Sequence, residues 1–204
     1  GITLEVRRGE RLVIIGGSGS GKSVLLKHLA GLFSADRGSL KIDGVEITNL
    51  GERQLAATRR KLGYLFQDGA LFGSLTVWDN IAFGLRRSSM PKDEIGARVD
   101  EMLRLTRMEK FAKRKPHQIS GGQRQRVALA RSLAKAPKLL LLDEPLGALD
   151  KKLRHDTQFE LMDIQEKTGT TFVIVTHDLR LAARMDRVLT LQQGKLLQEG
   201  SSVL

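Results

Sequence analysis

Short apolar runs and longer amphipathic stretches alternate along this chain of 204 residues. The apolar runs are rich in leucine, isoleucine and valine, and they have the length and branched side chains typical of buried strands. They lie at residues 11–15, 62–66, 138–144, 171–176 and 187–191. Apolar residues recur at helical spacing in residues 24–32, 52–60, 150–167 and, after Ser120, up to about Ala134. This alternation predicts an α/β fold with a mainly parallel sheet.

Two kinds of segment depart from the alternation. Residues 39–47 alternate apolar and polar side chains around Asp43-Gly44, which predicts a β-hairpin, and residues 187–191 and 195–198 form a second pair of strands around Gly194. From residue 76 onward the pattern is helical and charged, with Pro91 opening one helix and Pro116 closing the region. We therefore predict one domain, residues 1–204, with a small antiparallel β part and an α-helical subdomain inserted at about 76–118.

Composition restricts the classes of protein to consider. The chain is long enough to bury a substantial core, and it contains no cysteine, which excludes disulfides and cysteine metal sites. No apolar segment approaches the length of about 20 residues that spans a bilayer. The first residue is Gly1 rather than Met, and strand-like sequence follows almost at once. We therefore expect the N-terminus to be truncated.

The formal net charge of +11 raises the question of nucleic-acid binding. Residues 86–115 hold ten basic and five acidic side chains, but these are spread through helical sequence without interleaved exposed aromatic residues. A solvated helical face, or one near anionic lipid headgroups, explains the charge at least as well. Since no recognition motif accompanies the charge, we expect no direct contact with nucleic acid.

A glycine-rich loop joins the first predicted strand to the first predicted helix. It matches the pattern G-x-x-x-x-G-K-[ST] for phosphate binding. Glycines allow backbone N–H groups to close around a phosphate, and the next helix offers its positive N-terminal end. The candidate nucleotide-binding residues are Gly16, Gly17, Ser18, Gly19, Ser20, Gly21, Lys22, Ser23 and Val24. We expect Lys22 to reach the β- and γ-phosphates and Ser23 to bind Mg²⁺; the alternative is a turn that only connects strand and helix.

Polar residues lie at the ends of three other predicted strands, where ligands bind in open α/β sheets. They are Gln67, Asp143 with Glu144, and His177. Asp143 suits the organisation of Mg²⁺ beside Ser23, and Glu144 suits a general base that polarises water. The two carboxylates could instead cap the turn before Pro145. A lone histidine at a strand end is more often structural, but in this company His177 is a candidate for contact with the γ-phosphate.

A second geometry for anion binding opens a later helix, at Ser120-Gly121-Gly122-Gln123. Its glycines cannot easily share the phosphates already assigned to residues 16–23. The simplest interpretation is that it serves the nucleotide of another subunit.

Together these motifs resemble the nucleotide-binding subunit of an ATP-binding cassette (ABC) transporter, over nearly all of the chain. Residues 16–23 match the Walker A motif, residues 119–123 the signature motif with Ile119 in place of leucine, and residues 139–144 the Walker B motif. Gln67 matches the Q-loop, Ala148-Leu149-Asp150 the D-loop and His177 the switch histidine. The resemblance implies a P-loop NTPase core.

The resemblance also implies ATP and Mg²⁺ as ligands and a head-to-tail dimer with a second copy or a paralogous ATPase subunit. Each ATP would lie between the Walker motifs of one subunit and the signature motif of the other. Catalysis would involve Lys22, Gln67, Glu144 and His177, and Gln67 would approach the metal with Ser23 and Asp143. The chain would be cytoplasmic and peripheral, held at the inner face of the plasma (inner) membrane by transmembrane permease subunits.

Residues 68–80 would help to receive a helix of the permease, with Leu71, Phe72 and Trp78 as candidates for exposed contacts. The cargo is divided between two kinds of relative. Residues 13–29 and 63–72 resemble lipid-asymmetry and toluene-tolerance transporters, whereas residues 111–118 and 121–154 resemble polyamine importers. The alternative is an ABC ATPase acting on nucleic acid or ribosomes, but only 98 positions separate Lys22 from Ser120, too few for the long coiled coils of chromosome and repair proteins.

Overall fold

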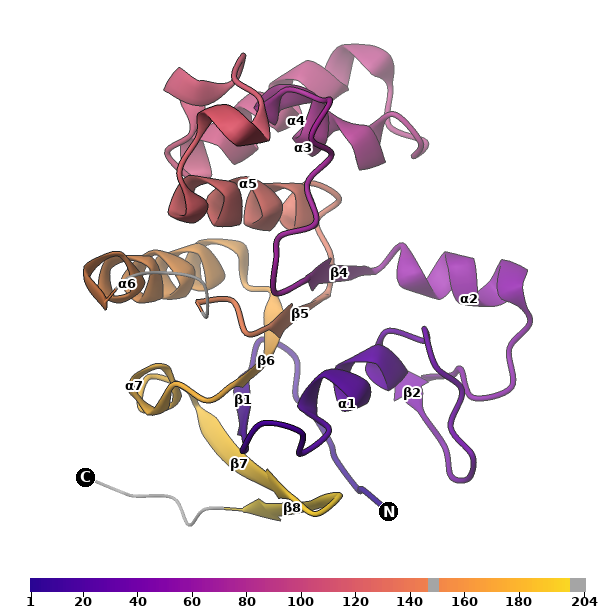
Figure 1. Ribbon diagram of the computed structural model, residues 1–204. Helices are drawn as coiled ribbons and strands as arrows, with labels where there is room; N and C mark the ends of the chain where they lie inside the picture. The colour runs from indigo at the N-terminus through magenta and orange to yellow at the C-terminus, as the bar shows by residue number, and fades with distance from the viewer. Residues whose placement is uncertain (147–150, 199–204) are drawn as a thin grey trace. The chain divides into compact units, whose positions relative to one another are not determined.

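The computed structural model describes residues 1–146 and 151–198, which form two compact units (Figure 1). Of the described residues, the first unit comprises 1–64, 138–144 and 170–198. The second comprises 65–137, 145–146 and 151–169, and it contains the helical block expected at 76–118. Within the described part of the chain, no helix combines the length and apolar character needed to cross a membrane.

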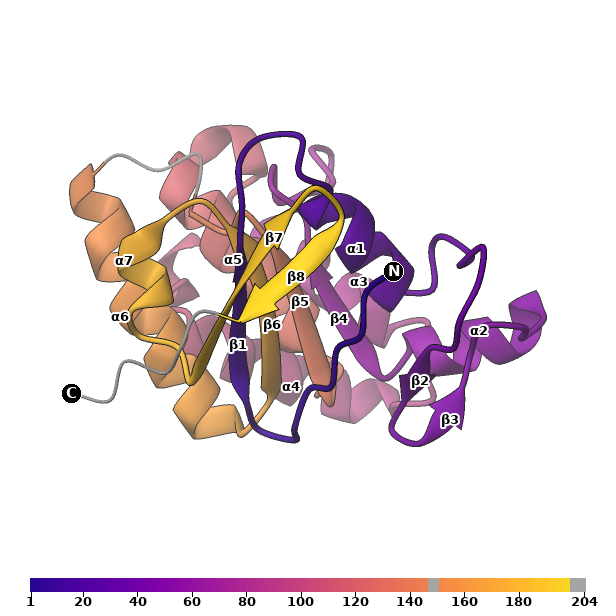
Figure 2. The ribbon, with the colours of Figure 1, turned by 90° about the horizontal axis from the view of Figure 1, so that it is seen from below.

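A six-stranded sheet organises the first unit, and Figure 2 shows its strands side by side. The strands are β1 (Arg11–Ile15), β4 (Leu62–Leu65), β5 (Leu139–Asp143), β6 (Thr171–Thr176), β7 (Arg187–Gln192) and β8 (Lys195–Gln198). Their order is β4-β5-β6-β1-β7-β8. Strand β6 pairs in parallel with β5 and β1, β1 pairs in parallel with β7, and β7 pairs with β8 in antiparallel fashion. The prediction of an α/β fold with a mainly parallel sheet is confirmed.

The predicted hairpin forms a separate two-stranded sheet of β2 (Lys41–Ile42) and β3 (Val45–Glu46), which pair in antiparallel fashion. Its turn residues Asp43 and Gly44 both have positive φ angles, 52° and 79°. Two such residues in succession match the twist of the flanking strands, which is why an Asp-Gly pair predicts a tight hairpin.

Among the residues that the structure describes, three helices belong to the first unit and four to the second. The first unit has α1 (Lys22–Leu29), α2 (Glu52–Arg59) and α7 (Leu179–Ala182). The second has α3 (Val77–Leu85), α4 (Lys92–Leu105), α5 (Gly121–Leu133), α6 (Lys151–Thr168) and the 3₁₀ turns η1 (Glu109–Phe111) and η2 (Pro116–Gln118). Two helices of the second unit begin where the sequence predicted, α4 after Pro91 and α5 after Ser120.

Two expectations about helices need correction, and one helix was not predicted. Helix α1 ends at Leu29 rather than at residue 32, because Gly31 adopts a left-handed conformation with a φ of +65°. The N–H of Leu32 then donates to the carbonyl of Lys27 at 2.8 Å, which is the hydrogen bond of a Schellman turn. Pro116 opens η2 instead of closing the helical region, since proline suits the first position of a helix. Helix α7 was not expected, because a single turn leaves little periodic signal.

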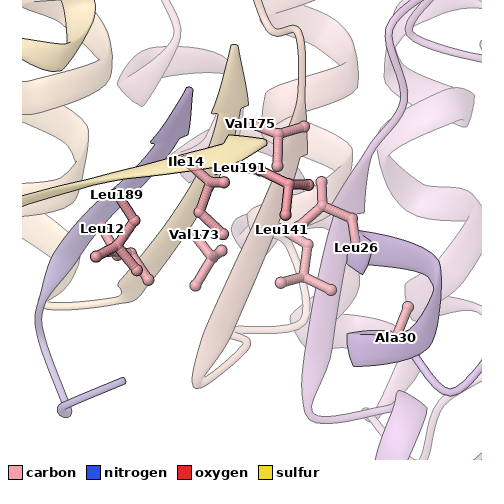
Figure 3. Close-up of a cluster of buried hydrophobic side chains, with 9 residues drawn as sticks. All are labelled: Leu12, Ile14, Leu26, Ala30, Leu141, Val173, Val175, Leu189 and Leu191. Atoms are coloured by element: carbon pink, nitrogen blue, oxygen red, sulfur yellow. The ribbon is translucent and has the colours of Figure 1, made fainter. Parts of the chain in front are cut away.

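The core of the first unit joins one face of the sheet to α1 (Figure 3). Alternate residues of a strand share a face, so β1, β6 and β7 each contribute two side chains separated by one position. Leu26 and Ala30, one turn apart, bring α1 onto this face. The buried cluster is Leu12, Ile14, Leu26, Ala30, Leu141, Val173, Val175, Leu189 and Leu191. Packing of α1 here fixes the helix whose N-terminus follows the glycine-rich loop.

We expect Leu141→Ala to lower the free energy of unfolding by about 2–5 kcal/mol, because Leu141 is fully buried in this cluster and its loss leaves a cavity. Leu197→Ala is the matched control, since Leu197 is 50% exposed and should change stability by less than about 0.5 kcal/mol. Urea unfolding followed by circular dichroism measures both. Equal losses for the two variants would contradict the assignment of the core.

Candidate functional site

The glycine-rich loop connects β1 to α1 in the first unit. Gly19 and Gly21 have φ angles of 76° and 96°, which only glycine adopts without strain. Gly21 occupies the N-cap position of α1 and supplies no side-chain cap. The first N–H groups of α1 are therefore not capped by a side chain at this position, as expected of a helix end that receives an anion.

Lys22 lies over this loop. Its Nζ donates hydrogen bonds to the carbonyl oxygens of Gly16, at 2.8 Å, and Gly17, at 3.1 Å, and the residue is only 8% exposed. A buried ammonium group is costly unless it is solvated by dipoles or paired with a negative charge. The loop carbonyls solvate this charge and hold it at the mouth of the loop.

Gly16 is required because β7 and the side chain of Ser20 approach its backbone closely. A Cβ atom on Gly16 would lie 2.6 Å from the carbonyl oxygen of Leu191 on β7 and 2.6 Å from Oγ of Ser20. Ser20 Oγ is itself buried, with no hydrogen-bond partner among the described residues. An unsatisfied buried hydroxyl is uncommon and calls for a ligand or water. It therefore fits a loop that holds phosphate.

Asp143 ends β5 and faces the first turn of α1. Ser23 Oγ donates to Asp143 Oδ1 at 2.8 Å, and the hydroxyl of Tyr64 on β4 donates to Oδ2 at 3.4 Å. Among described residues, no group of three or more His, Cys, Asp or Glu side chains is arranged to hold a metal. One carboxylate beside one hydroxyl suits Mg²⁺, because this ion takes most of its coordinating oxygens from water and phosphate and needs few from the protein.

Glu144 follows Asp143 in a strained backbone conformation, with a φ of +46°. Its N–H donates to the carbonyl of Val175 at 2.9 Å, which ties the residue to β6. Such strain costs about 1–3 kcal/mol, and it is found most often at functional sites. The conformation turns the side chain of Glu144 toward the end of the neighbouring strand.

The carboxylate of Glu144 is surrounded by donors. Oε2 accepts hydrogen bonds from Thr176 Oγ1 at 3.0 Å and from the backbone N–H of His177 at 3.3 Å, and it lies 3.0 Å from His177 Nδ1. Oε1 lies 3.9 Å from Lys22 Nζ. Of the residues predicted from the sequence, the structure thus brings together Lys22, Ser23, Asp143, Glu144 and His177.

Sequence reasoning missed two contributors to this cluster, Thr176 and Tyr64. Thr176 is the last residue of β6, and Tyr64 lies next to the end of β4. Neither belongs to a motif with a chemical role. Their position near the ends of strands was the only available signal, since side chains at strand ends surround ligands in open sheets.

The remaining predicted residues belong to the second unit or lie outside the described ranges. Gln67 lies in an exposed turn two residues after β4. Ser120 caps α5: its Oγ accepts from the N–H of Gln123 at 3.2 Å, while Gln123 Oε1 accepts from the N–H of Ser120 at 2.9 Å. This capping box leads into Gly121 and Gly122 in the first turn of α5. The D-loop match, Ala148-Leu149-Asp150, lies outside the described residues.

The segment after Gln67 is held firmly inside the second unit. Arg131 of α5 donates to the carbonyls of Gly69 and Ala70, each at 2.8 Å. Asn80, fully buried, accepts from the N–H of Phe72 at 2.8 Å and donates to its carbonyl at 3.1 Å. The ring of Phe72 stays 41% exposed and lies 4.3 Å from that of Phe83.

Of the expected contact residues, only Phe72 is therefore clearly exposed. Leu71 and Trp78 are of intermediate burial, so their exposure is smaller than that of Phe72. A fixed backbone that presents one exposed ring suits the binding of another protein.

Comparison with known proteins agrees with this geometry. A family model described as "ABC transporter" matches residues 1–147. The putrescine transport ATP-binding protein PotG of Escherichia coli K12 is 52% identical over 200 residues, which cover 98% of this chain and 52% of that protein. The spermidine/putrescine import ATP-binding protein PotA of Vibrio parahaemolyticus is 47% identical over 201 residues, with the same coverage. This chain thus spans about half the length of these relatives.

Solved structures resemble the chain along nearly all of its length. The dimeric ATP-binding cassette MJ0796, in a post-hydrolysis state with ADP and Pi, has a TM-score of 0.87 at 37% identity and covers 97% of this chain and 87% of its own. The protein cbiO1 of Clostridium perfringens, part of the ABC transporter complex cbiONQ, has a TM-score of 0.90 at 33% identity, with coverage of 97% and 79%. The predicted resemblance is confirmed.

We expect Gly16→Ala to destabilise the protein by about 1–3 kcal/mol, because the new methyl group would overlap the carbonyl of Leu191. Gly17→Ala is a matched control in the same loop, since a Cβ there meets nothing within 4 Å. Thermal unfolding without nucleotide measures both variants. A fall in melting temperature of the same size for the two would show that the close approach at Gly16 is not what requires glycine.

Proposed function

Because the chain belongs to the ABC transporter family, we propose that it is the ATP-hydrolysing subunit of a membrane transporter. The observation that carries this proposal is the cluster at the end of the parallel sheet, where Lys22 and His177 each lie within 4 Å of the carboxylate of Glu144. An anion-binding loop beside a carboxylate held by donors suits phosphoryl transfer to water, since that reaction needs positioning and charge stabilisation.

We assign the triphosphate of ATP to the loop and the first turn of α1. The backbone of residues 16–24 would bind it, and Lys22 would exchange the carbonyls of Gly16 and Gly17 for phosphate oxygens. Ser23 and Asp143 would hold Mg²⁺, which when bound neutralises charge on the phosphates. The orphaned hydroxyl of Ser20 and the uncapped end of α1 support this assignment.

Glu144 is assigned as the general base. Its Oε2 is already engaged by Thr176 and His177, so Oε1 is the oxygen best placed to take a proton from the attacking water. His177, 65% exposed in its side chain, would reach the γ-phosphate while its Nδ1 stays near Glu144. Gln67 would contribute to orienting the water and the metal, an assignment that rests on its match to the Q-loop.

The end of α5 is assigned to a second ATP. Ser120, Gly121, Gly122 and Gln123 would contact the nucleotide held by a second copy of the chain or by a paralogous ATPase subunit. The capping box supports this assignment because it fixes the start of α5. In it the Oγ atom of Ser120 accepts a hydrogen bond, so the hydroxyl can still donate one to a phosphate. The related cassette MJ0796 was solved as a dimer.

The names of the relatives support a choice of cargo. PotG is named for putrescine transport and PotA for spermidine/putrescine import, so we favour a polyamine importer, with a phospholipid or another lipid as the alternative cargo. The chain would lie at the cytoplasmic face of the inner membrane, bound to transmembrane permease subunits. Phe72 on its fixed backbone is the surface residue best suited to that contact.

Glu144→Gln tests the catalytic assignment. We expect ATP turnover to fall about 10²–10⁴-fold while ATP still binds, because the amide keeps the shape of the side chain and cannot accept the proton. Steady-state phosphate release and binding of a fluorescent ATP analogue separate the two effects. Glu101→Gln is the matched control, since Glu101 is an exposed partner of Arg98 on α4. Turnover at the normal rate in Glu144→Gln would remove Glu144 from the mechanism.

Phe72→Ala tests the contact with the permease. We expect it to lose capture of the co-expressed permease subunits while its melting temperature stays close to that of the unaltered protein, because the backbone of Phe72 remains held by Asn80. Phe33→Ala is the control, a similarly exposed phenylalanine at 47% in the first unit. Co-purification measures the outcome, and equal capture by both variants would place the contact elsewhere.

A further inference from the structure

Tyr64 lies beside the carboxylate assigned to Mg²⁺, although no motif includes it. Asp143 uses its two oxygens in different directions: Oδ1 accepts from Ser23 at 2.8 Å, and Oδ2 accepts from the hydroxyl of Tyr64 at 3.4 Å. The three residues come from neighbouring strands β4 and β5 and from α1, all in the first unit. Each oxygen of the carboxylate thus faces one hydroxyl donor.

The ring of Tyr64 is anchored independently of this bond. It is partly buried and packs against the cluster of hydrophobic side chains that joins the sheet to α1. The packed ring keeps the hydroxyl on the side of Asp143, where it donates to the carboxylate.

We propose that Tyr64 is a positioning residue for the metal: its hydroxyl holds Asp143 Oδ2, so that Oδ1 and the Ser23 hydroxyl face Mg²⁺. The proposal rests on the assignment of Ser23 and Asp143 to Mg²⁺. Without the hydroxyl the carboxylate can rotate about its last torsion, which is soft in aspartate. Partners that orient metal ligands typically change metal affinity 10–100-fold when removed. Because 3.4 Å is long for a bond between oxygens, we expect the lower end of that range.

Tyr64→Phe tests the proposal, since it removes one oxygen and keeps the packed ring. The affinity for a fluorescent, non-hydrolysable ATP analogue is measured over a series of Mg²⁺ concentrations and, separately, in excess EDTA. We expect the variant to need about 10-fold more Mg²⁺ for half-maximal enhancement of binding, with unchanged affinity in EDTA. Thr58→Val is the matched control, because it removes a hydroxyl of α2 that donates to the carbonyl of Gln54, at 3.2 Å, in the same helix.

Two results would overturn the proposal. One is an unchanged Mg²⁺ requirement in Tyr64→Phe; the other is an equal loss of affinity with Mg²⁺ and with EDTA, which would mean that the hydroxyl supports the nucleotide site in general. Failure of the underlying assignment has a different signature, because Asp143→Asn would then leave the Mg²⁺ requirement of the otherwise unaltered protein unchanged.

The position of the metal can be tested without any change at Tyr64. This is the single tyrosine of the sequence, so tyrosine labelled with ¹³C at Cζ gives one NMR signal. We expect Mn²⁺ with the ATP analogue to broaden that signal strongly, while Mg²⁺ with the analogue shifts it without broadening. A signal that stays sharp with saturating Mn²⁺ and analogue would place the metal far from Tyr64 and overturn the proposal.

Discussion

Charge compensation at the end of an apolar sheet is the constraint on which this structure depends. Lys22 and Asp143 are buried and Glu144 is nearly so, although each carries a charge. Removing one partner of a buried pair typically costs about 3–5 kcal/mol. Loop carbonyls and Glu144 compensate Lys22, and Ser23 and Tyr64 compensate Asp143. The same groups that stabilise the fold are thus those that an incoming phosphate and metal would rearrange.

Strand order and register explain why the cluster forms. Strands β5, β6 and β1 are consecutive in the sheet, and Asp143 pairs with Val175 while Ile15 pairs with Thr176. The three strands therefore end at almost the same level, which places Glu144, His177 and the glycine-rich loop next to one another. Apolar packing of α1 on the same sheet then brings Ser23 to Asp143. A slip of one residue in either pairing would turn the side chains to the opposite face.

The sequence predicted those parts of the fold and site that depend on local pattern. Apolar runs located the strands, Asp43-Gly44 located the hairpin, and Ser120 marked the start of its helix. The order of strands could not be predicted from such patterns, because it depends on contacts between residues far apart in the chain. For the same reason the left-handed conformation of Glu144 and the approach of Tyr64 to Asp143 had no local signal. Helix α1 ended early because the conformation of Gly31 prevailed over the apolar periodicity.

The two helix ends that we assign to nucleotide binding differ in whether side chains already cap their backbone N–H groups. Helix α1 begins after Gly21, which has no side chain to cap it, and Lys22 adds a positive charge at the same place. Helix α5 begins with a complete capping box, in which Ser120 and Gln123 satisfy each other's N–H groups. An anion gains more from an uncapped helix end with a cation than from an end that is already capped. Under the proposed function, ATP would bind first to the loop before α1, and α5 of a second subunit would add a weaker contact, as a reversible dimer requires.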